Sequence, residues 1–227
     1  MRTAIYGAGS LGTILGAFIS KAGEPIELIN RNKAHVAALQ SEGAKVTGTM
    51  QFTQKVNAYT PDQMSGQYDI IFLMTKQQNN KEVVTMLKDF LAPDGVLVTF
   101  QNGLPEIQIA EILGEERVLG CTVAWGATMQ SPGVCELTSE PDALSFGLGA
   151  ISANRSKHFD KVKELLDRAR KAGAIIYYDV NFRKSHAHEA IKLMPIILEN
   201  FEYADIVRGS NEDFGFMFGM TDPDKVY

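Results

Sequence analysis

The sequence predicts an α/β protein with a doubly wound, mostly parallel sheet, a mixed edge and a short α/β extension. Near the N-terminus, a short apolar run leads into a glycine-rich loop and then an apolar stripe at helical spacing. Further apolar runs alternate with helical patterns up to about residue 113. Hairpin-like strands follow, and they supply the mixed edge. This order is typical of a Rossmann-type fold.

The individual elements follow from apolar periodicity and from turn residues. Strands are predicted over 3–6, 25–31, 68–74, 96–100, 117–126, 134–137, 144–149, 174–183 and 204–208, with short strand-like pieces within 45–56. Helices are predicted from Ser10 onward and over 33–43, 80–91, 107–113, 158–171, 186–200 and 211–218. The continuous apolar character of the early strands indicates that both faces of the sheet are covered.

The glycine-rich loop is the strongest functional signal. Its first glycine allows a tight turn, its second lets backbone N–H groups approach a pyrophosphate, and its third lets helix and strand pack closely. The phosphates would lie at the positive end of the helix that follows. The residues expected to bind a dinucleotide here are Gly7, Ala8, Gly9, Ser10, Leu11 and Gly12. The alternative is a purely structural turn without a ligand.

The end of the second strand predicts the type of cofactor. NAD-preferring sites place Asp or Glu there, but this chain has Asn30-Arg31-Asn32. The guanidinium of Arg31 suits a 2′-phosphate, so the sequence favours NADP over NAD. The alternative is a solvated arginine at a helix start.

Polar residues also follow two later strands. Thr75 and Lys76 come after the run 68–74, and Asn102 comes after the run 96–100. Open α/β sheets bind ligands at the carboxyl ends of their strands, so these residues are expected beside the ligand. For Asn102 taken alone, the Asn-Gly turn pair is a sufficient explanation.

Composition limits the class of partner. The 227 residues carry a formal net charge of −5 without a Lys/Arg block, which argues against nucleic acid and membrane surfaces. No apolar run reaches the roughly 20 residues of a membrane span, and the chain enters a strand without a secretory signal. Cys121 and Cys135 are isolated, and His186 and His188 would point apart on a helix. We therefore expect a cytoplasmic protein with reduced thiols and no metal.

Together, the motifs GAGSLG, Asn30-Arg31, Thr75-Lys76 and Gln101-Asn102-Gly103 identify a family resemblance. Residues 1 to about 150 resemble the N-terminal domain of ketopantoate reductase (2-dehydropantoate 2-reductase), an enzyme of pantothenate biosynthesis. The resemblance implies NADPH on the glycine loop, with Arg31 on its 2′-phosphate. It also implies that Lys76 and Asn102 lie beside the cofactor and a 2-oxo acid, which is reduced to the 2-hydroxy acid.

The resemblance implies a proton-donor lysine from a helical C-terminal domain, and no such domain follows here. Lys76 and Asn102 would then have supporting roles only. We expect an impaired reductase or, alternatively, a non-catalytic NADP-binding module.

Residues 172–227 resemble part of a ribokinase-like (PfkB) carbohydrate kinase. The resemblance rests on Asp179-x-Asn181-x-Arg183 and on residues 203–213, where Ser210 and Asp213 replace the usual Asn and Glu. The glycine-rich anion hole and the catalytic aspartate of those kinases are absent, so kinase activity is not expected.

The sequence therefore predicts a chimeric chain. An NADP-binding Rossmann domain over 1–155 would precede an α/β segment over 156–227, with the seam between 150 and 172. The strand 175–180 would extend the parallel sheet, with Ile206 following it. The alternative is an exposed fragment with unpaired strand edges that self-associates.

Overall fold

The structure is a computed structural model. It describes residues 1–123, 125–139, 146–150, 160–165, 168, 177–179, 198, 206–208, 215, 218 and 219. Its main feature is a seven-stranded sheet in the order β11-β8-β7-β6-β1-β2-β5. These strands are β1 (Thr3–Tyr6), β2 (Ile26–Ile29), β5 (Asn57–Tyr59), β6 (Tyr68–Leu73), β7 (Leu91–Thr99), β8 (Val118–Val123) and β11 (Phe146–Ala150).

All neighbours in this sheet are parallel except β11, which pairs antiparallel with β8 at the edge. This confirms the predicted doubly wound, mostly parallel sheet with a mixed edge. Strand β7 begins earlier than predicted, because Leu91 pairs with Tyr68 while Val96 pairs with Ile70. Residues 93–95 are therefore an excursion inside the strand.

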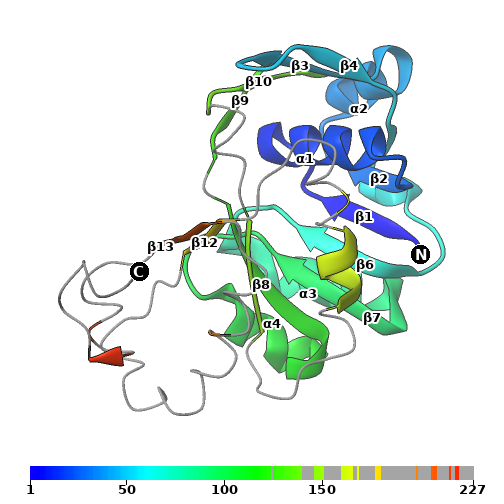
Figure 1. Cartoon of the computed structure of the whole chain (residues 1–227). Helices are drawn as coiled ribbons and strands as arrows, with labels where there is room; N and C mark the ends of the chain where they lie inside the picture. The colour runs from blue at the N-terminus through cyan, green and yellow to red at the C-terminus, as the bar shows by residue number, and fades with distance from the viewer. Residues whose placement is uncertain are drawn as a thin grey trace.

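Helices cover both faces of the sheet (Figure 1). One face packs against α1 (Ser10–Lys21) and α2 (Lys33–Glu42), and the other packs against α3 (Asn80–Phe90) and α4 (Pro105–Leu113). Alternation along β1 sends Ile5 toward the first pair of helices, and Ala4 and Tyr6 toward the second. Three short 3₁₀ helices, η1 (Pro61–Gln63), η2 (Gln77–Asn79) and η3 (Glu115–Arg117), lie in the connections.

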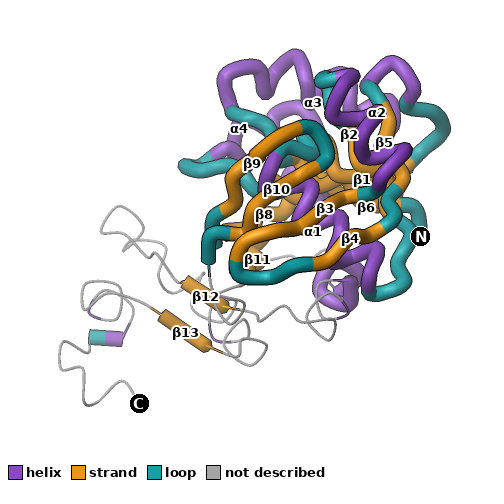
Figure 2. Tube along the Cα trace, turned by 90° about the horizontal axis from the view of Figure 1, so that it is seen from above, coloured by secondary structure: helices purple, strands orange, loops and turns teal. Residues whose placement is uncertain are grey.

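A second sheet lies over α1, and it corrects the sequence analysis. The hairpin-like strands do not all join the main sheet. Instead, β3 (Ala44–Gly48), β4 (Phe52–Gln54), β9 (Ala127–Ser131) and β10 (Val134–Leu137) form a separate sheet in the order β4-β3-β10-β9. Figure 2 shows this sheet spread across α1. The physical reason is that every residue of α1 from Gly12 to Ile19 is buried, so the helix needs cover on both sides.

The C-terminal part shows a second correction. Strand β12 (Tyr177–Asp179) pairs in parallel with β13 (Ile206–Arg208), and the two form a sheet of their own. The strand at 175–180 thus does not extend the main sheet. Residues 160–165 are helical within the predicted helix 158–171. The seam at 150–172 and the helices 186–200 and 211–218 lie largely outside the described residues.

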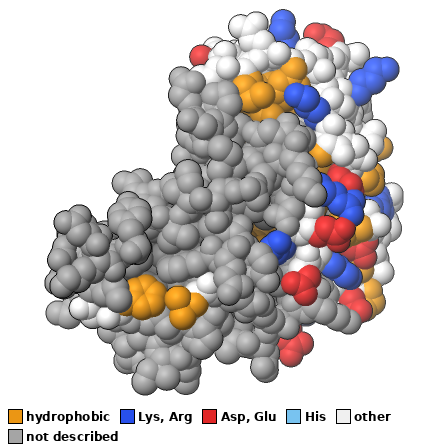
Figure 3. Space-filling view, viewed as in Figure 1, with side chains coloured by type: hydrophobic (Ala, Val, Ile, Leu, Met, Phe, Trp, Pro, Cys, Tyr) orange, Lys and Arg blue, Asp and Glu red, His pale blue; other side chains and the backbone are white. Residues whose placement is uncertain are grey.

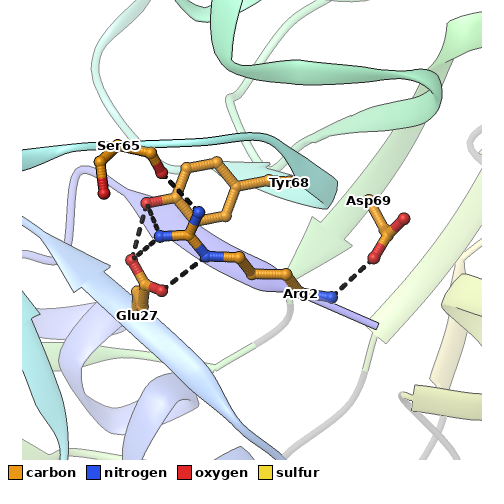
Figure 4. A network of polar contacts seen from close by, with 5 residues as sticks. All are labelled: Arg2, Glu27, Ser65, Tyr68 and Asp69. Carbon is orange, nitrogen blue, oxygen red and sulfur yellow. Dashed lines mark hydrogen bonds and ion pairs between the residues drawn. The ribbon is translucent and has the colours of Figure 1, made fainter.

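A polar network fastens the amino ends of β1, β2 and β6 (Figure 4). The guanidinium of Arg2 donates from Nε and Nη2 to the two carboxylate oxygens of Glu27, at 2.8 and 3.1 Å, and lies 4.2 Å from the ring centre of Tyr68. The Tyr68 hydroxyl donates to Glu27 at 2.7 Å, and the backbone N–H of Arg2 donates to Asp69 at 2.7 Å. Arg2 also donates to the carbonyl of Ser65. Burial and the Glu27 carboxylate raise the pKa of Tyr68, so this phenol keeps its proton.

A buried histidine connects helices α1 and α2 to the second sheet. His35 on α2 is fully buried, and its Nδ1 accepts the backbone N–H of Gly133 in the β9–β10 turn at 3.0 Å. Its Nε2 lies 3.0 Å from the hydroxyl of Thr13 on α1. Burial lowers the pKa of His35, so the ring is neutral at pH 7.

The buried His35 predicts a pH dependence of stability. Because its pKa is lowered on folding, the unfolded chain takes up this proton first as the pH falls below about 6.5. The free energy of unfolding therefore falls from pH 7.5 to pH 5.5, with a contribution from this site of at most about 1.4 kcal/mol per pH unit. His35→Gln removes that contribution and gives a shallower slope in urea unfolding. The other three histidines are common to both proteins and cancel. Equal slopes would contradict this role for His35.

Candidate functional site

The predicted site residues lie along the edge of the main sheet that is formed by the carboxyl ends of its parallel strands. The loops after β1, β2, β6 and β7 all leave from the carboxyl ends of adjacent parallel strands. The chain winds from β1 toward β2 in one direction and from β6 toward β7 in the other, so the switch point lies between β1 and β6. Ligands of open α/β sheets bind at such a point.

Two glycines of the loop allow close packing. Gly7 has a φ of +96°, and a Cβ there would lie 2.7 Å from Cγ2 of Thr75 and 2.9 Å from the carbonyl carbon of Met74. A Cβ on Gly12 would lie 3.0 Å from Ile5 and 3.1 Å from the Gly7 carbonyl oxygen. A side chain at Gly7 would push the loop away from the end of β6, and one at Gly12 would push α1 away from β1 and from the loop itself.

Gly9 differs, because it faces open space. A Cβ there would meet only the Gly7 carbonyl oxygen, at 3.9 Å. Helix α1 begins directly afterwards, has no side-chain cap and carries no acidic residue in its first turn. The N–H groups of Ser10 and Leu11 precede the first helical hydrogen bond, from Thr13 to Gly9 at 2.9 Å. The loop thus offers uncapped amides and a positive helix end beside room for an anion.

Strand β2 holds this loop in place. The N–H groups of Gly7 and Ala8 both donate to the carbonyl of Ile29 at 3.0 Å. Asn30 donates from Nδ2 to the carbonyl of Ala8 at 2.7 Å and accepts the N–H of Asn32 at 2.8 Å. Asn30 was predicted as a cofactor contact. The structure shows its side chain bound to the loop, where it fixes the loop's shape.

Arg31 follows at the same edge and is exposed. Within the part of the chain that the structure describes, it makes no hydrogen bond and no ion pair. Burial raises the pKa of Tyr6 at the end of β1, and the positive charge of Arg31 opposes that rise. Arg31 therefore lies close enough to β1 to act on it electrostatically, and its guanidinium is free to take an anionic ligand.

The loops after β6 and β7 are tied to each other. Gln101 donates from Nε2 to the carbonyl of Thr75 at 2.7 Å and to Oδ1 of Asn80 at 2.8 Å, and Asn80 returns a bond to Gln101 Oε1 at 2.8 Å. Thr99 adds a hydroxyl bond to the same Gln101 oxygen at 3.2 Å. This pair of amides fixes the loop that carries Lys76, whose side chain is exposed.

A further contact joins Asn102 to the loop that carries Lys76. The side chain of Gln77, the residue after Lys76, donates to the backbone carbonyl of Asn102. The exposed side chain of Asn102 is left available. Gly103 follows with a φ of +91°, as the Asn-Gly turn requires. Asn102 therefore forms the turn and lies at the same sheet edge, and its contact with a ligand stays a prediction.

Other predicted features lie away from this edge. Cys121 and Cys135 are free and buried, and burial raises the pKa of Cys135 to about 11. The described residues contain no group of three or more His, Cys, Asp or Glu arranged for a metal. Asp179 lies in β12, while Asn181, Arg183, His186, His188, Ser210 and Asp213 lie outside the described residues. Within the described chain, no helix has the length and apolarity to cross a membrane.

Sequence reasoning did not identify the residues that brace the site: Thr13, His35, Asn80 and Gln101. The sequence showed polar residues at the ends of the predicted strands, but it did not show their partners. Their partners come from segments far apart along the chain, as with Gly133 and His35, so spacing alone could not show the pairing.

Comparison with known proteins agrees with this geometry. The family model of ketopantoate reductase (PanE/ApbA) matches residues 3–150. The 2-dehydropantoate 2-reductase of Pyrococcus horikoshii is 30% identical over 171 residues, which are 74% of this chain and 54% of that protein. The chain spans about half the length of the curated relatives it matches. The match to the Pyrococcus horikoshii reductase covers a longer part of this chain than the family model does. The comparisons lend no support to a kinase-like segment or to a chimeric chain, and both stay predictions.

Solved structures show the same fold. The 2-dehydropantoate 2-reductase of Geobacter metallireducens superposes with a TM-score of 0.67 at 24% identity, over 75% of this chain and 56% of that one. A D-mandelate dehydrogenase in a ternary structure with NADH and anilino(oxo)acetate gives 0.68 at 21% identity, over 84% and 60%. At these identities the structural likeness supports the fold. With the family model matched over most of the chain, the protein belongs to the ketopantoate reductase (PanE/ApbA) family.

Proposed function

We propose that this chain binds NADPH at the carboxyl edge of its main sheet and serves the reduction of a 2-oxo acid, 2-dehydropantoate, to the 2-hydroxy acid. One observation carries the proposal. The uncapped amino end of α1 and the exposed guanidinium of Arg31, which has no partner among the described residues, lie at the ends of the adjacent strands β1 and β2.

The residues at this edge fit the dinucleotide. The pyrophosphate would lie against the N–H groups of Ser10 and Leu11, in the space left open at Gly9. Arg31 would bind the 2′-phosphate through a planar, charged fork. Because no acid ends β2, the 2′-phosphate meets no repulsion there.

The remaining polar side chains suit the 2-oxo acid. The bound nicotinamide supplies the hydride. Lys76 offers a positive charge for the substrate carboxylate or the developing alkoxide, and Asn102 offers an amide hydrogen-bond donor. The Asn80–Gln101 pair holds the Lys76 loop against the end of β7, so orientation is fixed before the substrate binds.

Arg31→Ala tests the cofactor. Loss of charge-assisted hydrogen bonds to a phosphate costs about 1.5–3 kcal/mol, so NADPH affinity should fall roughly tenfold to a hundredfold. NADH affinity should change by less than about twofold, because NADH lacks the 2′-phosphate. Titration of nicotinamide fluorescence measures both.

Lys33→Ala is the matched control, since it removes the same charge from an exposed position two residues later. It should leave the NADPH-to-NADH preference within about threefold of wild type, as expected for a screened surface charge. An Arg31→Ala protein that loses NADPH and NADH affinity equally would contradict the assignment of Arg31 to the 2′-phosphate.

A second candidate is a non-catalytic NADP-binding module. It is favoured because the site edge offers Lys76 and Asn102 in supporting roles only, while the family resemblance places the proton-donor lysine outside residues 1–150. The sugar-kinase resemblance of residues 172–227 suggests no further activity.

A turnover assay separates reductase from module. If the protein is a reductase, 2-dehydropantoate accelerates NADPH oxidation, and Lys76→Ala and Asn102→Ala each lower kcat/KM by at least about tenfold. Both variants should bind NADPH and unfold within about twofold and about 0.5 kcal/mol of wild type, since both side chains are exposed. Tight NADPH binding without any oxidation selects the module instead.

A further inference from the structure

The carbonyl of Ala8 is the best-anchored group of the glycine loop. It accepts Nδ2 of Asn30 at 2.7 Å and the hydroxyl of Thr13 at 3.2 Å. Ala8 and Thr13 are both fully buried. The carbonyl of Ala8 shares its peptide plane with the N–H of Gly9, so two donors on the oxygen fix the plane that leads into the amides of α1.

The Thr13 hydroxyl has a second partner behind it. Its oxygen lies 3.0 Å from Nε2 of His35, whose Nδ1 accepts the N–H of Gly133 at 3.0 Å. Because Nδ1 is an acceptor, a neutral ring carries its proton on Nε2. His35 therefore donates to Thr13, and the Thr13 hydroxyl has the Ala8 carbonyl and the thiol of Cys135 as its acceptors.

In this series of hydrogen bonds, each donor lies on the same side of its acceptor, from Gly133 toward Ala8. The order is Gly133 N–H, His35, Thr13 and the carbonyl of Ala8, and each donor is satisfied in a buried setting. Buried hydrogen-bond chains polarise their members and hold one geometry. A valine at position 13 would leave both the Nε2–H of His35 and one lone pair of the Ala8 carbonyl without this partner.

The direction of the Ala8 carbonyl matters to an anion. While Asn30 and Thr13 hold the oxygen, its lone pairs are taken by these two donors. Turning this peptide would bring a carbonyl dipole toward the pyrophosphate. Holding it is a form of preorganisation, because the loop presents amides before the ligand arrives.

We propose that Thr13 and His35 are positioning residues for the dinucleotide, which hold the Ala8 carbonyl away from the pyrophosphate and connect the glycine loop to the β9–β10 turn. This inference rests on the proposed NADPH site. Neither residue touches the ligand, and both act through Ala8.

Thr13→Val and Thr13→Ser form the matched test. Valine keeps the shape but removes the hydroxyl, and serine keeps the hydroxyl. NADPH affinity should fall about fivefold to tenfold in Thr13→Val, as for the loss of one net hydrogen bond, and stay within about twofold of wild type in Thr13→Ser. Ser41→Ala is the control, because its hydroxyl bonds only within α2 and it should bind as wild type.

Affinity is compared with urea unfolding of the same proteins. A purely structural role predicts lower stability in Thr13→Val with unchanged NADPH affinity, and that result overturns the inference. If Thr13→Val does not fold, His35→Asn replaces it. Its Oδ1 can still accept the Gly133 N–H while the donor to Thr13 is lost, and it should weaken NADPH binding about threefold. Unchanged affinity there also overturns the inference. Wild type that fails to bind NADPH refutes the proposed function itself.

Discussion

The structure depends on one close approach, that of the glycine loop to the carboxyl end of β6. Gly7 and Gly12 permit it. A Cβ on Gly7 would lie 2.7 Å from Thr75 and 2.9 Å from Met74, and a Cβ on Gly12 would lie 3.0 Å from Ile5. With the loop seated there, α1 points its uncapped end at the sheet edge. The four-stranded sheet then covers the outer side of α1 and buries it. The same packing that stabilises the fold therefore aims the helix dipole at the ligand site.

Polar contacts brace this arrangement at both ends of the sheet. At the amino end, Arg2, Glu27 and Tyr68 join three strands. Figure 3 shows basic and acidic side chains interspersed on the described surface that it draws. At the carboxyl end, the ties run between loops, through Asn30 to the glycine loop and through Gln101 to Asn80. The residues proposed to meet ligands, Arg31, Lys76 and Asn102, stay exposed and keep their polar groups available.

The sequence predicted the main sheet because parallel strands and glycine turns have local signatures. Strand β1, the start of α1 and the polar ends of β2 and β6 all follow from period and composition. The second sheet escaped prediction because β10 pairs with β3 from about ninety residues earlier, and no local pattern shows such a pairing. The pairs that brace the site, such as His35 with Gly133, also escaped prediction because their members lie far apart in the sequence. The expected extension by the strand at 175–180 was wrong for its described residues, 177–179, since β12 pairs with β13 in a separate sheet.

Gly9→Ala tests most directly whether the glycine loop binds a ligand or is only a turn. The φ of −78° at Gly9 lies outside the left-handed region that favours glycine, and the added Cβ meets the protein no closer than 3.9 Å. The account predicts a free energy of unfolding within about 0.5 kcal/mol of wild type and at least about a tenfold loss of NADPH affinity, because the methyl group fills the phosphate space. A stable Gly9→Ala protein that binds NADPH as tightly as wild type would contradict the account.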